Sequence, residues 1–351
     1  MILMREVKPA DLERLYLLAQ RLNTLNLPAD RDSLQSIIQK SNDSFGGRYA
    51  SIKDREYVFV MFDPKEDRLI GSCLIIAQHG TFERPSVYFQ VRKQQMYSST
   101  IARHFIHQTL QLTFDYDGPT EIGGLILDPD YRGHALKLGK LLSFVRFLYI
   151  GMHPDWFRGE IVAELLPPLA DDGGSDLWDY LGHNFTGLDY LAADRMSREN
   201  IEFIRSLFPA TPLYTSLLPE RVRDLIGQVG PKTKPVEKML RDIGFRYNDH
   251  IDPFDGGPTF TVPTDSCVPV ARTRRVTYSG PLDPDAPAQG RALIGYEYDD
   301  PEVRFRAAFV DYTIEADSAR VRGDGLDKLL LEPGAPLGIL PLTGPGLSPL
   351  Y

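Results

Sequence analysis

Residues 125–147, LILDPDYRGHALKLGKLLSFVRF, combine residue types that could bind a phosphate group. The apolar run that opens this stretch is typical of a buried strand, and the sequence DPD ends it abruptly. Two glycines would let the backbone approach a ligand closely, and a helix starting there would direct N–H groups and its positive dipole end at an anion. The cofactor-binding candidates are Leu125, Ile126, Leu127, Arg132, Gly133, Lys137, Leu138, Gly139 and Lys140.

The charges of this stretch support the same interpretation. Between Tyr131 and Pro154 there are four cations and no carboxylate, in a chain whose formal net charge is -9. The alternative is a strand–turn–helix unit whose basic face is simply solvated. The stretch contains neither G-x-x-x-x-G-K-[ST] nor G-x-G-x-x-G, so a P-loop and a dinucleotide fold are both excluded as its origin.

Composition narrows the class of protein. The 351 residues are 42% hydrophobic and 25% charged, as in an ordinary globular chain. The negative net charge argues against broad nucleic-acid binding. Two cysteines fit a reducing compartment, and no metal-ligand spacing is present. No apolar run reaches the roughly 18 residues of a membrane helix, and charge follows the start too early for a secretory signal. We expect a cytoplasmic protein without a metal or a membrane partner.

The elements that must position the phosphate candidates are an alternation of strands and helices. Apolar spacing predicts a strand at 123–128 before the turn and a helix from Leu138 after it. Further strands are expected at 56–63, 68–77, 86–93 and 161–166, and further helices at 8–22, 99–113 and 175–185. Residues 186–250 look mostly helical. This order predicts an α/β (α+β) fold with a mixed central sheet flanked by helices.

The character of the sequence changes near residue 258. From there the strand-like segments predict a small β-rich C-terminal subdomain at 258–351, with a loop or linker at 278–291 and an irregular, proline-rich tail. Residues 1–257 form the first predicted domain. A second partial copy of its fold around 186–257 is suggested by two helices, each ending in a glycine and an aromatic residue, although helices that end at glycine are common.

The turn resembles that of the GCN5-related N-acyltransferases (GNAT), in which an R-x-x-G-x-G/A loop holds the pyrophosphate of coenzyme A. A narrower resemblance is to the arginine N-succinyltransferase family, carried by LILDPDYR, VAELLPP, LWDYLGHNFTGLDYLAAD, PLYTSLLPE, IGQVGPKTKPVEKMLRDIGFRY and IDPFDGGPT. It covers roughly residues 1–275. It implies a GNAT-like acyl-CoA N-acyltransferase fold and succinyl transfer from succinyl-CoA to the α-amine of arginine, in arginine catabolism. No permanently bound cofactor is implied.

One position departs from the family. The family carries a histidine after IGQV that is proposed as the proton donor, whereas this chain has Gly230. Replacement acids near the matched motifs are Tyr214, His250 and His183, each of which could equally have a structural role. Because a guanidinium favours carboxylate partners, the resemblance implies Glu164, Asp189 and Asp255 as substrate-binding residues. The alternative for these three is a surface glutamate and two turn aspartates.

The resemblance predicts an arginine N-succinyltransferase that works as a homo- or hetero-oligomer. Two alternatives stay open. The chain could be a non-catalytic or regulatory subunit of a heteromeric succinyltransferase, which the glycine at 230 favours. It could also be an acyl-CoA N-acyltransferase that acts on ornithine or another amine.

Overall fold

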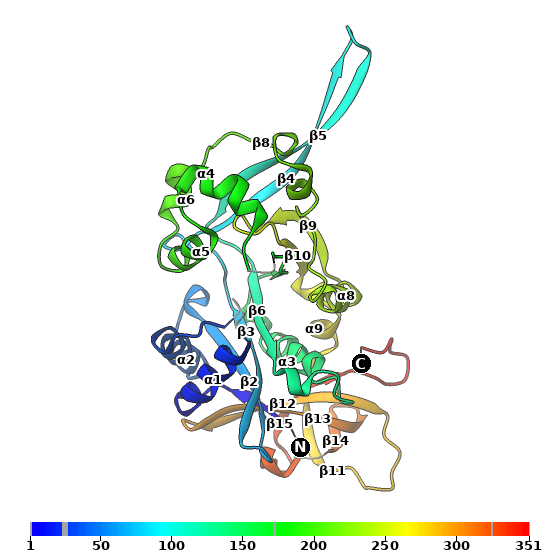
Figure 1. Ribbon diagram of the computed structural model, residues 1–351. Coiled ribbons are helices and arrows are strands. Elements are labelled where there is room, and N and C mark those ends of the chain that lie inside the picture. Colours follow the sequence, from blue (N-terminus) through cyan, green and yellow to red (C-terminus); the bar gives the residue numbers. More distant parts are fainter. Residues whose placement is uncertain (1, 23–26, 171–172, 324–325, 351) are drawn as a thin grey trace. The chain divides into compact units, whose positions relative to one another are not determined.

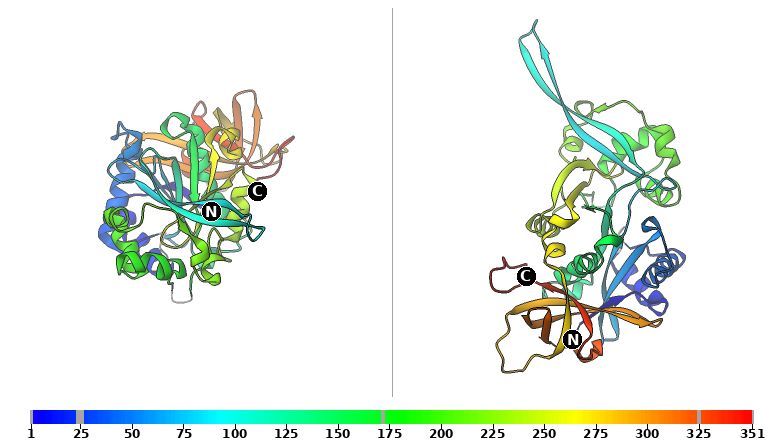
Figure 2. Two further views of the ribbon diagram at one scale, coloured as in Figure 1. Left: turned by 90° about the horizontal axis from the view of Figure 1, so that it is seen from above. Right: turned by 180° about the vertical axis from the view of Figure 1, so that it is seen from behind.

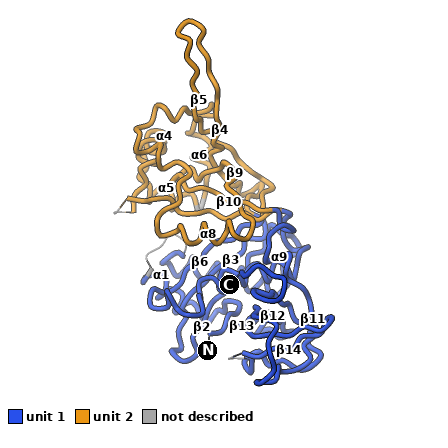
Figure 3. The backbone as a smooth tube through the Cα atoms, turned by 90° about the vertical axis from the view of Figure 1, so that its right-hand side faces the viewer, with its two compact units in different colours: residues 1–78, 120–159, 263–351 blue, residues 79–119, 160–262 orange. Residues whose placement is uncertain are grey.

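The computed structural model describes residues 2–22, 27–170, 173–323 and 326–350. The chain divides into two compact units, each built from discontinuous segments (Figure 3). Unit 1 comprises residues 1–78, 120–159 and 263–351, and unit 2 comprises 79–119 and 160–262. No helix in the described ranges is both long and apolar enough to cross a membrane.

Unit 1 is a mixed α/β layer joined to a closed β-barrel. Its open sheet has the order β13-β1-β2-β3-β6, and all of these neighbours are antiparallel. The elements are β1 (Leu3–Glu6), α1 (Leu12–Leu22), α2 (Arg31–Phe45), β2 (Glu56–Asp63), β3 (Arg68–Ile76), β6 (Thr120–Leu127) and α3 (Leu138–Met152) (Figure 1). The strands predicted at 56–63, 68–77 and 123–128 and the helix predicted from Leu138 are confirmed.

Alternation along β2 explains why helices cover both faces of this sheet. Val58 and Val60 point into a core with the buried faces of α1 and α2. The residues between them, Tyr57 and Phe59, point to the opposite face, where their rings pack against Tyr149 of α3. Each strand of β2 and β3 is therefore buried on both sides, which accounts for its nearly continuous apolar sequence.

The C-terminal barrel closes because β12 pairs with both β15 and β13. Around it the order is β12-β15-β11-β14-β13, with β11 and β14 parallel and the other neighbours antiparallel. Its strands are β11 (Arg274–Pro281), β12 (Gly290–Asp300), β13 (Val303–Glu315), β14 (Ser318–Arg322) and β15 (Pro336–Pro341), preceded by α9 (Val268–Arg272). The predicted irregular tail is wrong in part, because β15 supplies Leu337 and Ile339 to the barrel core. The predicted loop at 278–291 is shorter, since β11 runs to Pro281 and β12 starts at Gly290.

Unit 2 is a six-strand sheet in the order β7-β10-β9-β4-β5-β8, among the residues described. Its strands are β4 (Ser86–Ser98), β5 (Arg103–Asp115), β7 (Glu160–Glu164), β8 (Leu213–Tyr214), β9 (Arg246–Ile251) and β10 (Pro258–Pro263). Its helices are a π-helical turn at Trp178–Gly182, α4 (His183–Thr186), α5 (Tyr190–Glu199), α6 (Glu202–Leu207), α7 (Glu220–Arg223) and α8 (Lys234–Asp242). Trp178 stacks on Phe254 with ring centroids 4.9 Å apart in its core.

Two predictions from the sequence differ from the structure of unit 2. The helix predicted at 99–113 is wrong, because β5 pairs along its whole length with β4 as a long hairpin. The boundary predicted at residue 258 also differs, since β10 pairs with β9 inside unit 2 and the barrel strands begin at Arg274. The duplication suggested around 186–257 stays a prediction.

Candidate functional site

The strand that leads into the candidate phosphate turn carries a β-bulge. Ser72 pairs with Ile126 and Leu74 pairs with Gly123, so Gly124 and Leu125 together lie opposite the single residue between Ser72 and Leu74. Gly124 has φ +56°, and a Cβ there would come within 2.9 Å of a Leu74 methyl. The bulge interrupts the regular ladder at Gly124 and Leu125. The side chain of Ile126 lies in the core beneath α1 and α2, so only its backbone could bind a ligand.

Asp128 fixes the start of the turn. Its carboxylate is only 1% exposed and accepts hydrogen bonds from Arg21 (3.1 Å), from Arg68 and from the main-chain N–H of Asp130 (3.0 Å). Its own N–H donates to the carbonyl of Ile70 on β3 at 2.7 Å. The DPD sequence is therefore an anchored turn that determines the direction in which the next residues leave the sheet.

The turn itself is exposed and presents main-chain amides. Residues 132–137 are exposed, and Gly133 and Lys137 adopt φ of +75° and +42°. The N–H groups of Leu138 and Gly139, in the first turn of α3, have no acceptor within the part of the chain that the structure describes. A Cβ at Gly139 would meet only a Leu127 methyl, at 3.7 Å, so the space beside this glycine is uncrowded. Amides without an acceptor at the start of a helix are groups to which an anion can bind.

The fourth cation of the stretch has a structural role. Arg146 is buried; its guanidinium donates to the carbonyl of Gly123 at 3.0 Å and to the hydroxyl of Ser143 at 2.7 Å. It ties α3 to the bulged strand. Arg132, Lys137 and Lys140 therefore remain as the cations of the turn, with the Lys140 ammonium also lying 5.6 Å from the Phe144 ring centroid.

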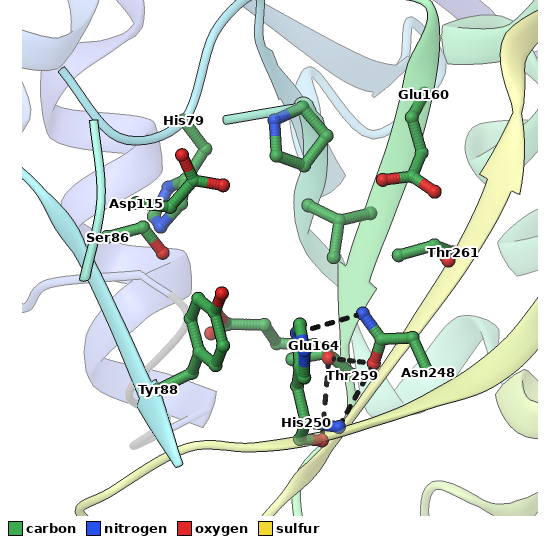
Figure 4. Close-up of a pocket in the computed structure, with 12 residues that line it drawn as sticks. His79, Ser86, Tyr88, Asp115, Glu160, Glu164, Asn248, His250, Thr259 and Thr261 are labelled. Carbon is green, nitrogen blue, oxygen red and sulfur yellow. Dashed lines mark hydrogen bonds between the residues drawn. The ribbon is translucent and has the colours of Figure 1, made fainter. Parts of the chain in front are cut away.

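Unit 2 contains a separate pocket with an acidic lining (Figure 4). It encloses about 470 Å³, counting the space at its mouth. Three carboxylates, from Asp115, Glu160 and Glu164, and no lysine or arginine are found among its described lining residues. Glu160, Val162 and Glu164 lie on one face of β7, while Ile161 and Ala163 are buried on the other. The remaining lining residues are His79, Ser86, Tyr88, Pro119, Asn248, His250, Thr259 and Thr261.

His250 lies in a hydrogen-bonded chain on the wall of this pocket. The hydroxyl of Thr259 donates to Asn248 Oδ1 at 2.6 Å, and Asn248 Nδ2 lies 3.2 Å from His250 Nδ1. Because the amide NH₂ can only donate, Nδ1 accepts and the proton of the neutral ring is on Nε2. The ring stacks on Tyr88 at 4.0 Å, and burial lowers the pKa of His250. His250 is therefore neutral near pH 7.

Two carboxyls lie within electrostatic reach of one another beside the pocket. Burial, and then repulsion from Glu164, raises the pKa of Asp252 to about 7. Burial, and then repulsion from Asp252, raises the pKa of Asp255. Asp255 accepts from the N–H of Gly257 at 2.7 Å and so also serves the DGGP turn. Asp252, which is not among the site residues predicted from the sequence, accepts from the N–H groups of Phe254 and Asp255 with the same oxygen, Oδ1.

The shifted pKa of Asp252 predicts a pH-dependent effect of Asp252→Asn on stability. The folded pKa lies above the ordinary value of 3.8, so the folded state holds the proton more tightly and wild-type stability falls as pH rises from about 4 to about 7. Asparagine keeps the accepting oxygen and removes the charge. Urea titrations measure the free energy of unfolding of both proteins. The difference, variant minus wild type, should rise by about 1–3 kcal/mol between about pH 4 and about pH 8. A stability difference that does not change with pH would contradict the assignment.

The other predicted site residues lie outside this pocket. Tyr214, on β8, donates its hydroxyl to Gln94 on β4 at 2.7 Å. His183 is exposed, with Nδ1 3.0 Å from the carbonyl of Leu188. Asp189 caps α5 by accepting from the N–H of Ala192 at 2.8 Å. Of the six predicted catalytic and substrate-binding residues, the structure thus brings Glu164 and His250 together in the pocket.

The backbone around Gly230 is closed. Its N–H donates to the carbonyl of Leu166 at 2.9 Å, and a Cβ built on it would lie 2.6 Å from the carbonyl oxygen of Pro167. Since that contact is with backbone, a side chain here requires the segment after β7 to move.

Comparison with known proteins gives consistent results. The family described as arginine N-succinyltransferase beta subunit matches residues 2–268. Proteins named arginine N-succinyltransferase from Shigella dysenteriae serotype 1 and Escherichia coli K12/DH10B are each 32% identical over 293 residues, covering 82% of this chain and 84% of theirs. The solved structure of arginine/ornithine succinyltransferase subunit AI from Pseudomonas aeruginosa aligns with a TM-score of 0.82 at 24% identity, over 98% of this chain and 99% of that one. The predicted α/β fold, with a mixed sheet flanked by helices, is confirmed.

Proposed function

This chain belongs to the arginine N-succinyltransferase family of acyl-CoA-dependent acyltransferases, and we propose that it transfers succinyl from succinyl-CoA to the α-amine of L-arginine in arginine catabolism. The observation that carries the proposal is the bulged strand β6 followed by two open amides at the start of α3. We place the reaction in the cytoplasm, where the two buried free thiols, Cys73 and Cys267, stay reduced.

We assign the acyl donor to unit 1. The diphosphate of coenzyme A would accept from the amides of Leu138 and Gly139, with Arg132 and Lys137 supplying positive charge. The pantetheine would run along the backbone of residues 125–127. The amide of Leu125, one of the two residues of the bulge, would stabilise the oxyanion that forms when the amine attacks the thioester.

We assign the acceptor to the acidic pocket of unit 2. A pocket lined by three carboxylates without a lysine or arginine among its described residues favours a cation. Glu164 is our partner for the guanidinium, because a carboxylate can accept two parallel N–H bonds from it. The repulsion between Glu164 and Asp252 provides a reason for the pocket to take up positive charge.

The proton balance of the reaction does not require the missing histidine. The α-ammonium gives up two protons, of which one ends on the thiol of coenzyme A and one in solvent. A thiolate is a good leaving group, and one general acid contributes about 10²–10⁴ in rate. Of the three predicted catalytic residues, His250 lines the pocket; because its ring is neutral near pH 7, it would donate a proton to the thiolate only after taking one up, as from the α-ammonium. Tyr214 and His183 remain candidates on sequence grounds alone.

The direct test is the release of free thiol by the purified chain with succinyl-CoA and arginine. We expect release that depends on both substrates, and N-succinylarginine as the product by mass spectrometry. Ornithine with succinyl-CoA, and arginine with acetyl-CoA, are the comparison pairs. Turnover with ornithine but not with arginine would show that ornithine is the acceptor. Turnover with acetyl-CoA but not with succinyl-CoA would show that acetyl-CoA is the donor.

A second function is favoured by the closed backbone at Gly230. Because the carbonyl of Pro167 occupies the space of a side chain there, the chain could be a non-catalytic subunit that retains the coenzyme A turn. The name of the Pseudomonas structure, a subunit AI, supports such an arrangement. Calorimetry distinguishes the two functions: the subunit hypothesis requires coenzyme A to bind to a chain that releases no thiol.

A further inference from the structure

The hairpin of β4 and β5 extends well beyond the rest of unit 2 (Figures 1 and 2). The two strands pair continuously from Ser86 opposite Asp115 to Ser98 opposite Arg103. Near its base the hairpin is held on both edges, by β9 at Phe89 and Gln90 and by β8 at Thr109 and Leu110. Toward the tip, among the residues described, no further strand is paired with it. We call residues 92–107 the arm.

The arm has an apolar surface that the described chain leaves uncovered. The five large apolar side chains that are exposed on it are Met96 (46%), Tyr97 (69%), Ile101 (62%), Phe105 (53%) and Ile106 (57%). An isolated two-stranded hairpin is marginally stable in water, and clustered exposed apolar residues mark an interaction site. The arm therefore needs a partner surface to account for its length and composition.

The register shows that both faces of the arm are apolar. Met96 lies opposite Phe105 and so shares one face with it, whereas Tyr97 lies opposite His104 on the other face, which also carries Ile106. A hairpin that simply lay on its own unit would need only one apolar face. Two apolar faces suit an element that is inserted into a concave or cleft-like surface of another molecule.

Charge identifies the kind of partner. From residue 84 to residue 114 there is no aspartate or glutamate, while Arg84, Arg92, Lys93 and Arg103 are positive. The whole chain, these cations included, has a net charge of -9, so the rest of the protein is more acidic still. The arm is thus a cationic, apolar segment on an anionic protein. Complementarity of this kind steers association and suppresses wrong partners.

We propose that the arm is a docking element that inserts against the acidic body of a second copy of this chain, with each copy's arm engaging the other in a two-fold dimer. Like charge disfavours pairing of the two arms with each other, and opposite charge favours contact of arm with body. A two-fold arrangement makes the same contact twice. Two arms, with five large apolar side chains each, can reach the roughly 1,200–2,000 Å² of a stable interface.

Light scattering of the full chain tests the oligomeric state. We expect a mass about twice the 39.6 kDa of one chain at about 10 µM protein. The double variant Met96→Asp/Ile106→Asp places a charge on each face of the arm and should be monomeric, with an unchanged far-UV circular dichroism spectrum because both sites are exposed. Leu217→Asp is the matched control: Leu217 is 83% exposed but lies outside the arm, and the variant should stay dimeric.

A second measurement locates the contact. Cys73 and Cys267 are buried, so Ile101→Cys adds one reactive thiol at the tip for a photo-crosslinker. In a mixture of isotopically heavy and light chains, we expect crosslinks between copies from residue 101 to an acidic surface outside residues 84–114. A monomeric wild type, a dimer that survives the double substitution, or crosslinks from arm to arm would each overturn the proposal. The first outcome would point to a different protein as the occupant.

Discussion

Replacement of Glu164 by Gln is expected to raise the KM for arginine by about 10- to 100-fold, while the KM for succinyl-CoA changes by less than about twofold. Glu164 is the one of the three predicted substrate-binding residues that lines the acidic pocket. A hydrogen bond to a charged group contributes about 1.5–3 kcal/mol, which sets the size of the effect. The amide of glutamine keeps the shape but can present only one oxygen to a guanidinium.

The matched control for this experiment is Asp189→Asn. Asp189 is another of the substrate-binding residues predicted from the sequence, but its side chain caps α5, and asparagine is as good a cap. The Asp189→Asn variant should therefore keep the wild-type KM for arginine. Steady-state kinetics with each substrate varied in turn measures both constants. Our assignment of the acceptor site would fail if Glu164→Gln left the arginine KM unchanged, or if Asp189→Asn raised it as much.

The parts of the fold that could be predicted are those whose signals are local. The hairpin of β2 and β3, the strand β6 and the helix α3 are long, apolar and bounded by turn residues, so periodicity identifies them without tertiary information. The open amides at the start of α3 were expected for the same reason, since a strand, two glycines and a helix determine where N–H groups point. The anchoring role of Asp128 was not, because it depends on Arg21 and Arg68 from other elements.

The errors arise where context overrides local pattern. Residues 103–115 have apolar side chains at spacings that fit a helix as well as a strand, and pairing with β4 decides the outcome. The prolines of the tail exclude a helix but still allow β15, in which Pro336 and Pro341 stand at the two ends of the strand. A local stretch of sequence therefore decides neither between helix and strand at 103–115 nor between strand and irregular chain at β15.

The acidic pocket was only partly predictable, because its walls come from distant segments. Glu160 could have been found, since it shares with Glu164 the alternate face of one strand. Asp115, Asn248 and Thr259 could not, as nothing in the sequence places the end of β5 beside β9 and β10. Asp252 was also missed, because its raised pKa arises from burial and from Glu164, neither of which is a feature of the sequence near it.

Reversal of charge at the phosphate turn, by Arg132→Glu, is expected to raise the KM for succinyl-CoA by about 10- to 100-fold with little change in the KM for arginine. Arg132 is exposed on the turn that leads to the open amides of Leu138 and Gly139. The substitution replaces an attraction to the diphosphate with a repulsion of similar size, about 1 kcal/mol each at an exposed site. Because exposed charges are screened, the defect should shrink as ionic strength rises.

Arg320→Glu makes the same change of charge elsewhere on unit 1 and serves as the control. Arg320 is exposed on β14 of the barrel, so its reversal alters the net charge equally without touching the turn. Calorimetric titration with coenzyme A and with dephosphorylated pantetheine separates the two parts of the donor. Arg132→Glu should weaken the binding of coenzyme A and leave that of pantetheine unchanged. Equal effects of the two reversals would mean that Arg132 acts only through net charge, and the turn at 132–139 would then not be the diphosphate site.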